Sequence, residues 1–256
     1  MGAPQMELPE LEGLCPEFGM DFLELRTLAG TTALPDYFRK RPDLARNSIF
    51  PVRVVSTNLR LAEAMPKDID AFLEFARLAD ALGAPYVRVF GGGGWEKPLP
   101  DGFLEQAAIN ATRCRDKMSE AGVRCEMLLE THSAFSSAEL CARLCEQAPG
   151  SLFILWDSHH TWKLAGETLE ESWRTIGAHV RHIHYKDSRS IPSGRHPFSY
   201  VLPGTGEFPS LDLLRLLAAQ NYTGGVSLEW ERLWHPELPA LSKALSAFQA
   251  LLREAG

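Results

Sequence analysis

Short apolar runs that end in a polar residue alternate with longer amphipathic segments through most of the chain. The clearest run is Leu152–Leu155, whose β-branched and aromatic side chains predict a buried strand. Asp157, His159 and His160 then fall in the loop that follows this strand. Similar runs predict further strands over residues 20–26, 51–57, 86–90, 125–130, 180–185 and 224–229. Strands that alternate with helix-length segments are typical of a parallel α/β fold.

Apolar positions at helical spacing follow most of these strands. Residues 67–83 carry such a stripe from Ile69 to Leu82 and end at Gly83, a common stop signal. Ser136 and Glu139 have the spacing of a capping box, which predicts the start of another helix. The other predicted helices cover residues 7–17, 104–121, 167–176 and 210–220, and a C-terminal segment striped by Leu241, Leu245, Phe248 and Leu252.

Only seven strands can be counted, because too little apolar sequence precedes residues 7–17 to form another. A (β/α)8 TIM barrel typically needs about 250 residues, and this chain has 256. We therefore expect an α/β fold in which residues 1–256 form a single TIM barrel domain whose first strand is missing or very short. The stretch 186–209, with Pro203–Gly206 inside it, is expected to be a long loop.

Composition narrows the classes of function. The chain has 33 acidic and 26 basic residues, a net charge of −7, which argues against nucleic acid as the main ligand. No apolar run approaches the ~20 residues of a membrane span, and the N-terminal residues lack the pattern of a secretory signal. The five cysteines follow no tight disulfide framework. Reduced thiols, a cytoplasmic location and no membrane partner are therefore expected.

Two of the cysteines, Cys141 and Cys145, lie four residues apart on one predicted helical face. Such a pair suits a metal in principle. No other soft ligand lies nearby in the sequence, so we favour the interpretation that both are small buried hydrophobic side chains.

Four polar residues stand at equivalent points, where successive predicted strands end: Glu130, Asp157, His184 and Glu229. A parallel barrel would gather them at one mouth. Three carboxylates and an imidazole form a hard oxygen and nitrogen site that suits one divalent metal ion, Mn²⁺, Mg²⁺, Co²⁺ or Zn²⁺. A cation would also allow the carboxylates to stay ionised together. The alternative is that these polar residues have only a structural role at the mouth of the barrel.

Other residues are candidates for ligand contact. Gly91–Gly94 and Trp95 follow the third predicted strand, where glycines would let a ligand approach or form a flexible connection. Lys186, Arg189 and Arg195 could hold a phosphate or carboxylate, or could simply be solvated. Inward-pointing charges are expected at Glu24, Arg26 and Arg88, for which a structural ion pair is the favoured interpretation.

Five short motifs resemble those of the xylose-isomerase-like TIM barrel superfamily of sugar and sugar phosphate isomerases and epimerases. Their order and spacing over roughly residues 20–235 are similar to that superfamily, although they do not name a substrate. The motifs are LLETH (128–132), LWDSHH (155–160), HIHYKD (182–187), PGTGEFP (203–209) and SLEWE (227–231).

The resemblance implies roles for individual residues. Glu130, Asp157, His184 and Glu229 match the four metal ligands, and the two glutamates also match the pair that transfers a proton. His160 matches a histidine that touches substrate. His184 is preferred to His182 as ligand because it matches the second histidine of the H-x-H pattern. A homo-oligomer would also be consistent with the resemblance.

The resemblance thus implies a divalent-metal-dependent isomerase or epimerase of a sugar, sugar phosphate or related keto-polyol, acting through an enediolate. The metal would polarise a carbonyl and neutralise the charge that develops on it. One departure concerns ketose epimerases, which carry a further glutamate shortly after the first ligand. Here His132 lies in that stretch, so it would substitute for the glutamate or the substrate differs.

Three alternatives remain from the sequence. The first is an inosose-type dehydratase or keto-sugar lyase that uses the same metal site. The second is a relative of DNA-repair endonucleases, which would call for more metal-binding residues and a basic rim than this chain has. The third is a non-catalytic sugar-binding barrel, a hypothesis that the curtailed first strand keeps open.

Overall fold

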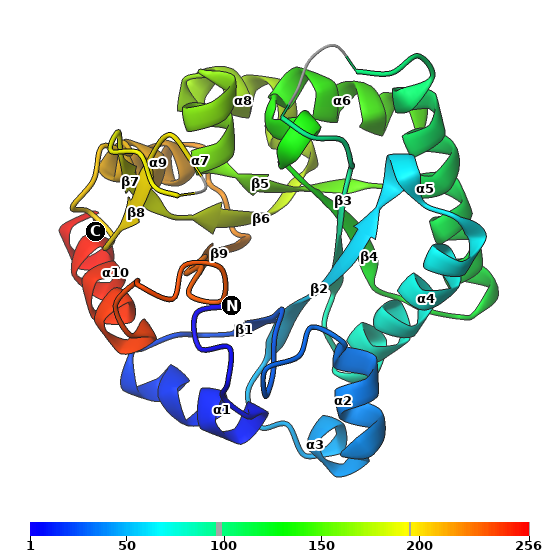
Figure 1. Cartoon of the computed structure of the whole chain (residues 1–256), viewed down its shortest axis with the longest axis horizontal. Coiled ribbons are helices and arrows are strands. Elements are labelled where there is room, and N and C mark those ends of the chain that lie inside the picture. The colour runs from blue at the N-terminus through cyan, green and yellow to red at the C-terminus, as the bar shows by residue number, and fades with distance from the viewer. Residues whose placement is uncertain (96–98, 195, 256) are drawn as a thin grey trace.

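The computed structural model describes residues 1–95, 99–194 and 196–255. Within these ranges, parallel strands form a nearly closed barrel that helices surround (Figure 1). The barrel strands are β1 (Leu23–Leu25), β2 (Val52–Arg60), β3 (Tyr86–Phe90), β4 (Glu126–Glu130), β5 (Phe153–Asp157), β6 (Val180–Tyr185) and β9 (Gly225–Leu228). The structure therefore confirms the TIM barrel prediction.

The helices follow the strands around the outside of the barrel (Figure 1). Most predicted boundaries hold to within one or two residues. The α-helices are α1 (Leu8–Glu17), α2 (Leu34–Lys40), α3 (Pro42–Arg46), α4 (Pro66–Ala81), α5 (Phe103–Glu120), α6 (Ala138–Gln147), α7 (Ser158–His160), α8 (Leu169–Ile176), α9 (Ser210–Ala219) and α10 (Leu241–Ala255). Four short helical turns complete the set: η1 (Leu61–Glu63), η2 (Ser133–Ser136), η3 (Thr161–Ala165) and η4 (Gly177–His179).

The sheet order is β1-β2-β3-β4-β5-β6-β9, and no pairing joins β9 to β1 among the described residues. The expectation of a missing first strand is thus confirmed as an open seam between these two strands. The predicted strand over 20–26 is reduced to three residues of regular pairing, Leu23–Leu25, with an irregular register between Leu23 and Glu24.

Strand alternation divides each barrel strand between two environments. On β4, Leu129 points outward into the large core that the helices cover, whereas Leu128 and Glu130 point inward. On the inner side Leu128 packs with Val54 and Leu155 in a small separate apolar cluster. The same alternation therefore places apolar side chains deep in the barrel and acidic ones at the carboxyl ends of the strands.

The long loop predicted over 186–209 contains structure of its own. Strands β7 (Asp187–Arg189) and β8 (Ser199–Val201) pair as an antiparallel hairpin. The Asp187 carboxylate then accepts hydrogen bonds from the backbone N–H groups of Gly206 and Phe208, at 2.8 and 3.1 Å. A Cβ atom on Gly206 would lie 2.1 Å from Asp187 Oδ1, so this approach requires glycine.

Two local predictions were wrong. The N-cap of α6 is Ser137, whose hydroxyl accepts from the Leu140 N–H, while the Ser136 hydroxyl donates to a carbonyl within η2. The capping box was therefore misplaced, since the η2 turn already uses Ser136. In α10 the predicted apolar stripe included Leu252, but Leu251 is buried and Leu252 is 39% exposed. Leu251 continues the buried face of Leu245 and Phe248 at helical spacing, and Leu252 falls to one side of that face.

The described helices include none with the length and apolar character that a membrane crossing requires.

Candidate metal centre

Four strands bring the predicted ligands to one point inside the mouth. Glu130 and Asp157 are the last residues of β4 and β5, His184 is near the end of β6, and Glu229 follows β9 directly. One ligand atom from each lies within 4.8 Å of the others. Glu130, Asp157 and His184 are at most 2% exposed. The interpretation that all four form one buried group is thus supported by the geometry.

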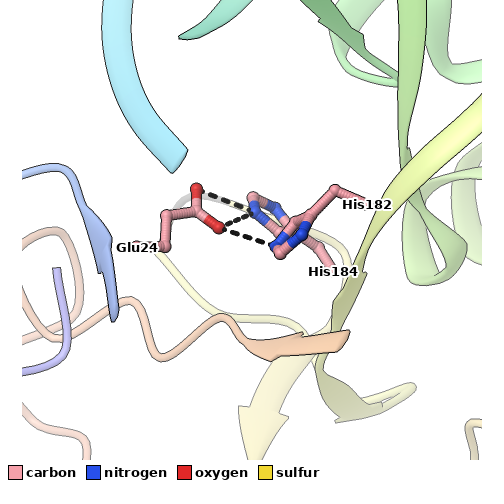
Figure 2. A group of neighbouring side chains, drawn as sticks. All are labelled: Glu24, His182 and His184. Carbon is pink, nitrogen blue, oxygen red and sulfur yellow. Dashed lines mark hydrogen bonds and ion pairs between the residues drawn. The ribbon is translucent and has the colours of Figure 1, made fainter. Parts of the chain in front are cut away.

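Glu24 orients the His184 ring. Figure 2 shows its carboxylate facing the imidazoles of His182 and His184. His184 Nε2 lies 2.9 and 3.0 Å from the two Glu24 oxygens, so this nitrogen carries a hydrogen that it donates to them. The other nitrogen, Nδ1, makes no hydrogen bond among the described residues and lies 3.4 Å from Glu229 Oε2. A carboxylate that holds one imidazole nitrogen while the other faces a ligand cluster is the usual arrangement around a metal.

His182 lies beside this pair without joining the four ligands. Its Nε2 is 2.7 Å from the Ser227 hydroxyl and 3.2 Å from Glu24 Oε2. Glu24 accepts a further hydrogen bond from the Ser56 hydroxyl, at 2.8 Å. His182 and Ser56 therefore support Glu24, as expected of a residue deeper in the barrel.

Lys186 is a buried cation with three carboxylate neighbours. Its ammonium lies 2.7 Å from Asp157 Oδ2 and 3.1 Å from Glu231 Oε1, and it also contacts Glu229 Oε2. Burial lowers the pKa of Lys186, but Asp157 and Glu229 outweigh burial and hold this pKa well above its ordinary value. The predicted role of Lys186 in substrate binding must therefore coexist with this internal pairing.

Arg88 forms a second ion pair, as the structural interpretation of inward charges expected, whereas Arg26 forms none among the described residues. Its Nε lies 2.9 Å from Glu130 Oε2, and its Nη1 donates to the Thr57 carbonyl at 2.9 Å. Arg88 is 1% exposed. Burial nevertheless raises the pKa of Glu130, because the nearby guanidinium compensates only part of the lost hydration.

Asp157 and Glu229 have opposite shifts although both contact Lys186. Burial raises the pKa of Asp157 to about 8 in spite of the ammonium. Burial also acts to raise the pKa of Glu229, but Lys186 and His184 outweigh it and hold that pKa well below its ordinary value. The mouth therefore contains one carboxyl that retains a proton readily and one that loses it readily.

The donor set fits a divalent cation. With every carboxyl group ionised and His184 neutral, as metal binding requires, five carboxylates gather at the mouth around three cationic side chains and leave a formal charge of minus two: Glu24, Glu130, Asp157, Glu229 and Glu231 against Arg26, Arg88 and Lys186. One divalent ion would balance that charge. His184 Nδ1 provides the nitrogen without a hydrogen bond that such an ion would use.

Trp95, His132 and His160 form an aromatic wall at one side of the mouth. The ring centroids of the two histidines are 5.0 Å apart, and that of Trp95 lies 5.5 Å from His132 and 5.9 Å from His160. His160 donates its backbone N–H to Asp157 Oδ1 at 2.9 Å, which ties the wall to the ligand cluster. Burial lowers the pKa of His132 to about 3, so this imidazole is neutral at neutral pH.

One of the predicted anion-binding residues, Arg189, is not brought to the cluster. Arg189 is exposed and donates its Nε hydrogen to the Thr205 carbonyl at 2.9 Å, which holds the loop after the hairpin. Arg195 lies outside the described residues. Substrate binding by Arg189 remains a prediction that this geometry does not favour.

The cysteine pair on α6 does not bind a metal in this geometry. Both thiols are free and buried, and Cys141 donates to the Phe135 carbonyl at a distance of 3.1 Å. Burial raises the pKa of Cys145 to about 12, so it stays a neutral thiol. The interpretation as small buried side chains is supported.

Sequence reasoning missed the roles of Glu24 and Glu231. Alternation along residues 20–26 indicated that Glu24 points inward, but no local signal paired it with a histidine 160 positions away. Glu231 lies two residues after a ligand, in the SLEWE motif, and its contact with Lys186 depends on where the loop after β9 turns.

Solved structures with the same fold include proteins that are named for different activities. The probable 3-DHS dehydratase AsbF of Bacillus anthracis matches at 17% identity and a TM-score of 0.78, over 96% of this chain and 94% of that one. The 3-keto-D-glucoside 4-epimerase YcjR of E. coli matches at 14% identity and a TM-score of 0.70, over 96% of this chain and 94% of that one. An IOLI protein with a bound zinc atom matches at 19% identity and a TM-score of 0.78, over 99% of this chain and 94% of that one. At these identities the likeness shows a shared fold.

A search of curated protein sequences finds no match to this chain. A family model described as "Xylose isomerase-like TIM barrel" matches residues 17–251, which is most of the chain. The order of strands, the four candidate ligands at the carboxyl ends of the strands and this match agree. The chain belongs to the xylose isomerase-like TIM barrel family.

Proposed function

We propose that this protein is a divalent-metal-dependent isomerase or epimerase that moves a proton next to the carbonyl of a small keto sugar or keto-polyol. The observation that carries the proposal is the buried group of Glu130, Asp157, His184 and Glu229, in which His184 Nδ1 makes no hydrogen bond to any described residue. These four side chains would hold the ion. When bound, the ion would polarise the substrate carbonyl and so make the neighbouring C–H bond acidic.

Glu130 and Glu229 are the residues that we assign to proton transfer. In the sheet order, β5 and β6 separate β4 from β9, so the two glutamates approach the centre from opposite sides. Their environments also differ, because the pKa of Glu229 is lowered by Lys186 and His184 whereas burial raises that of Glu130. Glu229, which the lowered pKa keeps ionised, would accept the proton, and Glu130, whose pKa is raised, would donate a proton of its own to the enediolate.

The position to which the proton returns determines the product. Return to the same carbon from the other face gives an epimer, and return to the neighbouring carbon gives an isomer. The aromatic wall of Trp95, His132 and His160 covers one side of the centre, where it would exclude water and pack against the C–H face of the substrate.

The test combines metal analysis with isotope exchange. Purified protein is loaded with Mn²⁺, its metal content is measured, and deuterium incorporation from D₂O is followed in ketoses, ketose phosphates and inososes. We expect near one equivalent of metal and exchange at a carbon next to the carbonyl. Glu229→Gln should reduce exchange by roughly 10²–10⁴-fold, the usual contribution of a general base.

A surface variant, Glu74→Gln, provides the matched control, because Glu74 is exposed and pairs only with arginines of the surface. Metal content is measured for both variants, so a loss of exchange can be separated from a loss of metal. If no metal binds after Mn²⁺ is supplied, or if Glu229→Gln keeps full exchange, the proposal is wrong.

Elimination of a β-hydroxyl is the second candidate function. The observation that favours it is the neutral His132 beside the cluster, where a hydrogen-bonding imidazole could meet a leaving hydroxyl. The same experiment distinguishes the two reactions, since a dehydratase yields an α,β-unsaturated carbonyl that absorbs in the near ultraviolet.

A further inference from the structure

A cavity of about 360 Å³ runs along the open seam between β1 and β9. Its outer part is lined mainly by apolar side chains of α1, β1, β9 and α10, and residues 1–3 form part of its wall. Its inner end is polar and reaches the candidate metal centre, where it is lined by Glu24, Arg26, Arg88, His184 and Glu229. A ligand in this cavity would therefore meet the metal ligands at one end.

Arg26 differs from the other cations at this inner end. It is 7% exposed, and its Nη2 donates to Asn58 Oδ1. Its Nη1 is buried and has no hydrogen-bond partner among the described residues. Arg88 and Lys186 each form an ion pair with a carboxylate, whereas no described carboxylate forms one with Arg26. Glu24, Glu130 and Glu229 act on the Arg26 guanidinium electrostatically but none lies within ion-pair distance of it. A buried N–H group without an acceptor is costly, so Nη1 indicates an acceptor that the described residues do not supply.

A second donor beside Arg26 is also unused. Thr27 is 3% exposed, lines the same cavity, and its buried hydroxyl has no hydrogen-bond partner among the described residues. Buried polar groups in folded proteins are nearly always paired. Two unpaired donors therefore line one cavity, which favours a ligand that carries more than one acceptor oxygen.

The number of unused donors favours a carboxylate over a phosphate. Arg26 Nη1 and the Thr27 hydroxyl offer one donor to each of two oxygens, which matches a carboxylate. A phosphate brings a second negative charge and a third oxygen into a mouth that already contains Glu24, Glu130 and Glu229.

We propose that Arg26 and Thr27 bind a carboxylate of the substrate, so that the substrate class is a keto acid, such as a keto-aldonate. This inference rests on the proposed function for the position of the carbonyl at the metal. Arg26 is then the residue that determines specificity, while Arg88 and Lys186 organise the catalytic carboxylates.

The test compares probes that share a six-carbon skeleton. Binding of 2-keto- and 5-keto-D-gluconate, D-fructose and D-fructose 6-phosphate to the Mn²⁺-treated full chain is measured by calorimetry. The wild type should bind at least one keto-aldonate more tightly than fructose or its phosphate. Arg26→Met should weaken binding of that keto acid by roughly 10- to 100-fold, the usual value of a charge-assisted hydrogen bond. Arg26→Lys, which keeps the charge but loses the planar fork, should give an intermediate loss.

Arg77→Met is the matched control, because Arg77 is an exposed arginine that pairs with Glu74 on α4. It should leave keto-acid affinity unchanged. Circular dichroism and the unfolding midpoint show whether each variant is folded. If Arg26→Met does not fold, the keto-acid affinity of Arg26→Lys is compared with that of the wild type instead. The inference is overturned if the wild type binds neither keto acid, if it prefers the phosphate, or if both Arg26 variants bind the keto acid as the wild type does.

These outcomes are independent of the proposed function. An Arg26-dependent preference for keto acids without Mn²⁺ binding or deuterium exchange would support the carboxylate site and contradict the metal-dependent reaction. Deuterium exchange in fructose or its phosphate, with no preference for keto acids, would support the metal-dependent reaction and contradict the carboxylate site.

Discussion

Two buried cations at the mouth of the barrel, Lys186 and Arg26, have opposite surroundings. Lys186 lies on the β6 side among the carboxylates of Asp157, Glu229 and Glu231. Arg26 lies on the β1 side, where its Nη2 donates to the side-chain amide of Asn58. Its Nη1 has no acceptor among the described residues. Both side chains are at least nine-tenths buried.

The difference indicates two kinds of function for a buried charge. A cation with several internal carboxylates stabilises the folded chain, because its removal leaves those carboxylates buried and unpaired. A cation with no internal counterion contributes little to stability and much to the affinity for an anion from outside. The predictions below test this distinction, beginning with the largest expected effect.

Lys186→Met should lower the free energy of unfolding of the chelator-treated protein by about 3–5 kcal/mol, the usual cost of removing one partner of a buried ion pair. Urea denaturation measures the change. Lys117→Met is the control, since Lys117 pairs with Asp70 at the surface and should cost less than about 1 kcal/mol. A loss for Lys186→Met that equals the control would show that the carboxylates do not need this cation.

Metal affinity should rise with pH between about 6 and 8. The pKa of Asp157 is raised to about 8 by burial, and Glu24 and Glu229 hold that of His184 well above its usual value against burial. Both groups therefore bind protons at neutral pH, and both must lose them to ligate a metal. Each proton released makes affinity rise about tenfold per pH unit until the group is deprotonated. Calorimetry of Mn²⁺ binding in buffers of different ionisation enthalpy counts the protons, and a pH-independent affinity would contradict the ligand assignment.

Glu24→Gln should weaken Mn²⁺ binding by about 10- to 100-fold, the usual effect of losing the carboxylate that orients a ligand histidine. The amide retains the shape but can present an N–H to His184 Nε2, which favours the wrong tautomer. Glu63→Gln is the control, because Glu63 forms a surface pair with Arg60. Equal Mn²⁺ affinity in Glu24→Gln and the wild type would show that His184 is held by other contacts.

Arg26→Met should change the free energy of unfolding by no more than about 1 kcal/mol, since the chain loses one hydrogen bond and is relieved of a buried unpaired charge. The same urea titration used for Lys186→Met measures it, so the two values can be compared directly. A cost as large as that of Lys186→Met would mean that Arg26 has an internal counterion, and the distinction between the two cations would fail.

Much of the fold could be predicted from the sequence because its signals are local. The strand over 86–90 and the strand over 180–185 were predicted with their observed bounds, since each contains β-branched and aromatic side chains that favour a strand. The shortage of apolar residues before α1 predicted the missing strand for the same reason. The hairpin β7–β8 was missed because its strands have three residues each and mixed burial.

The candidate ligands were also accessible from the sequence. A parallel barrel brings the carboxyl ends of its strands together, so the position of Glu130 or Asp157 at the end of a run already predicts where it lies. The expectation that Lys186 and Arg189 serve an anion was less successful. Whether a cation is free depends on its neighbours in space, and those neighbours come from β5, β9 and the loop before α9.

The sequence by itself thus determined the family, the barrel and the four candidate ligands at its mouth, because periodicity and strand ends are properties of consecutive residues. Only the tertiary structure decided which charges neutralise one another. It paired His184 with Glu24 and Lys186 with three carboxylates, and it left Arg26 Nη1 and the Thr27 hydroxyl without a partner among the described residues. Electrostatic interactions depend on distance and burial rather than on sequence separation, so these pairings depend on how the strands meet in the closed fold.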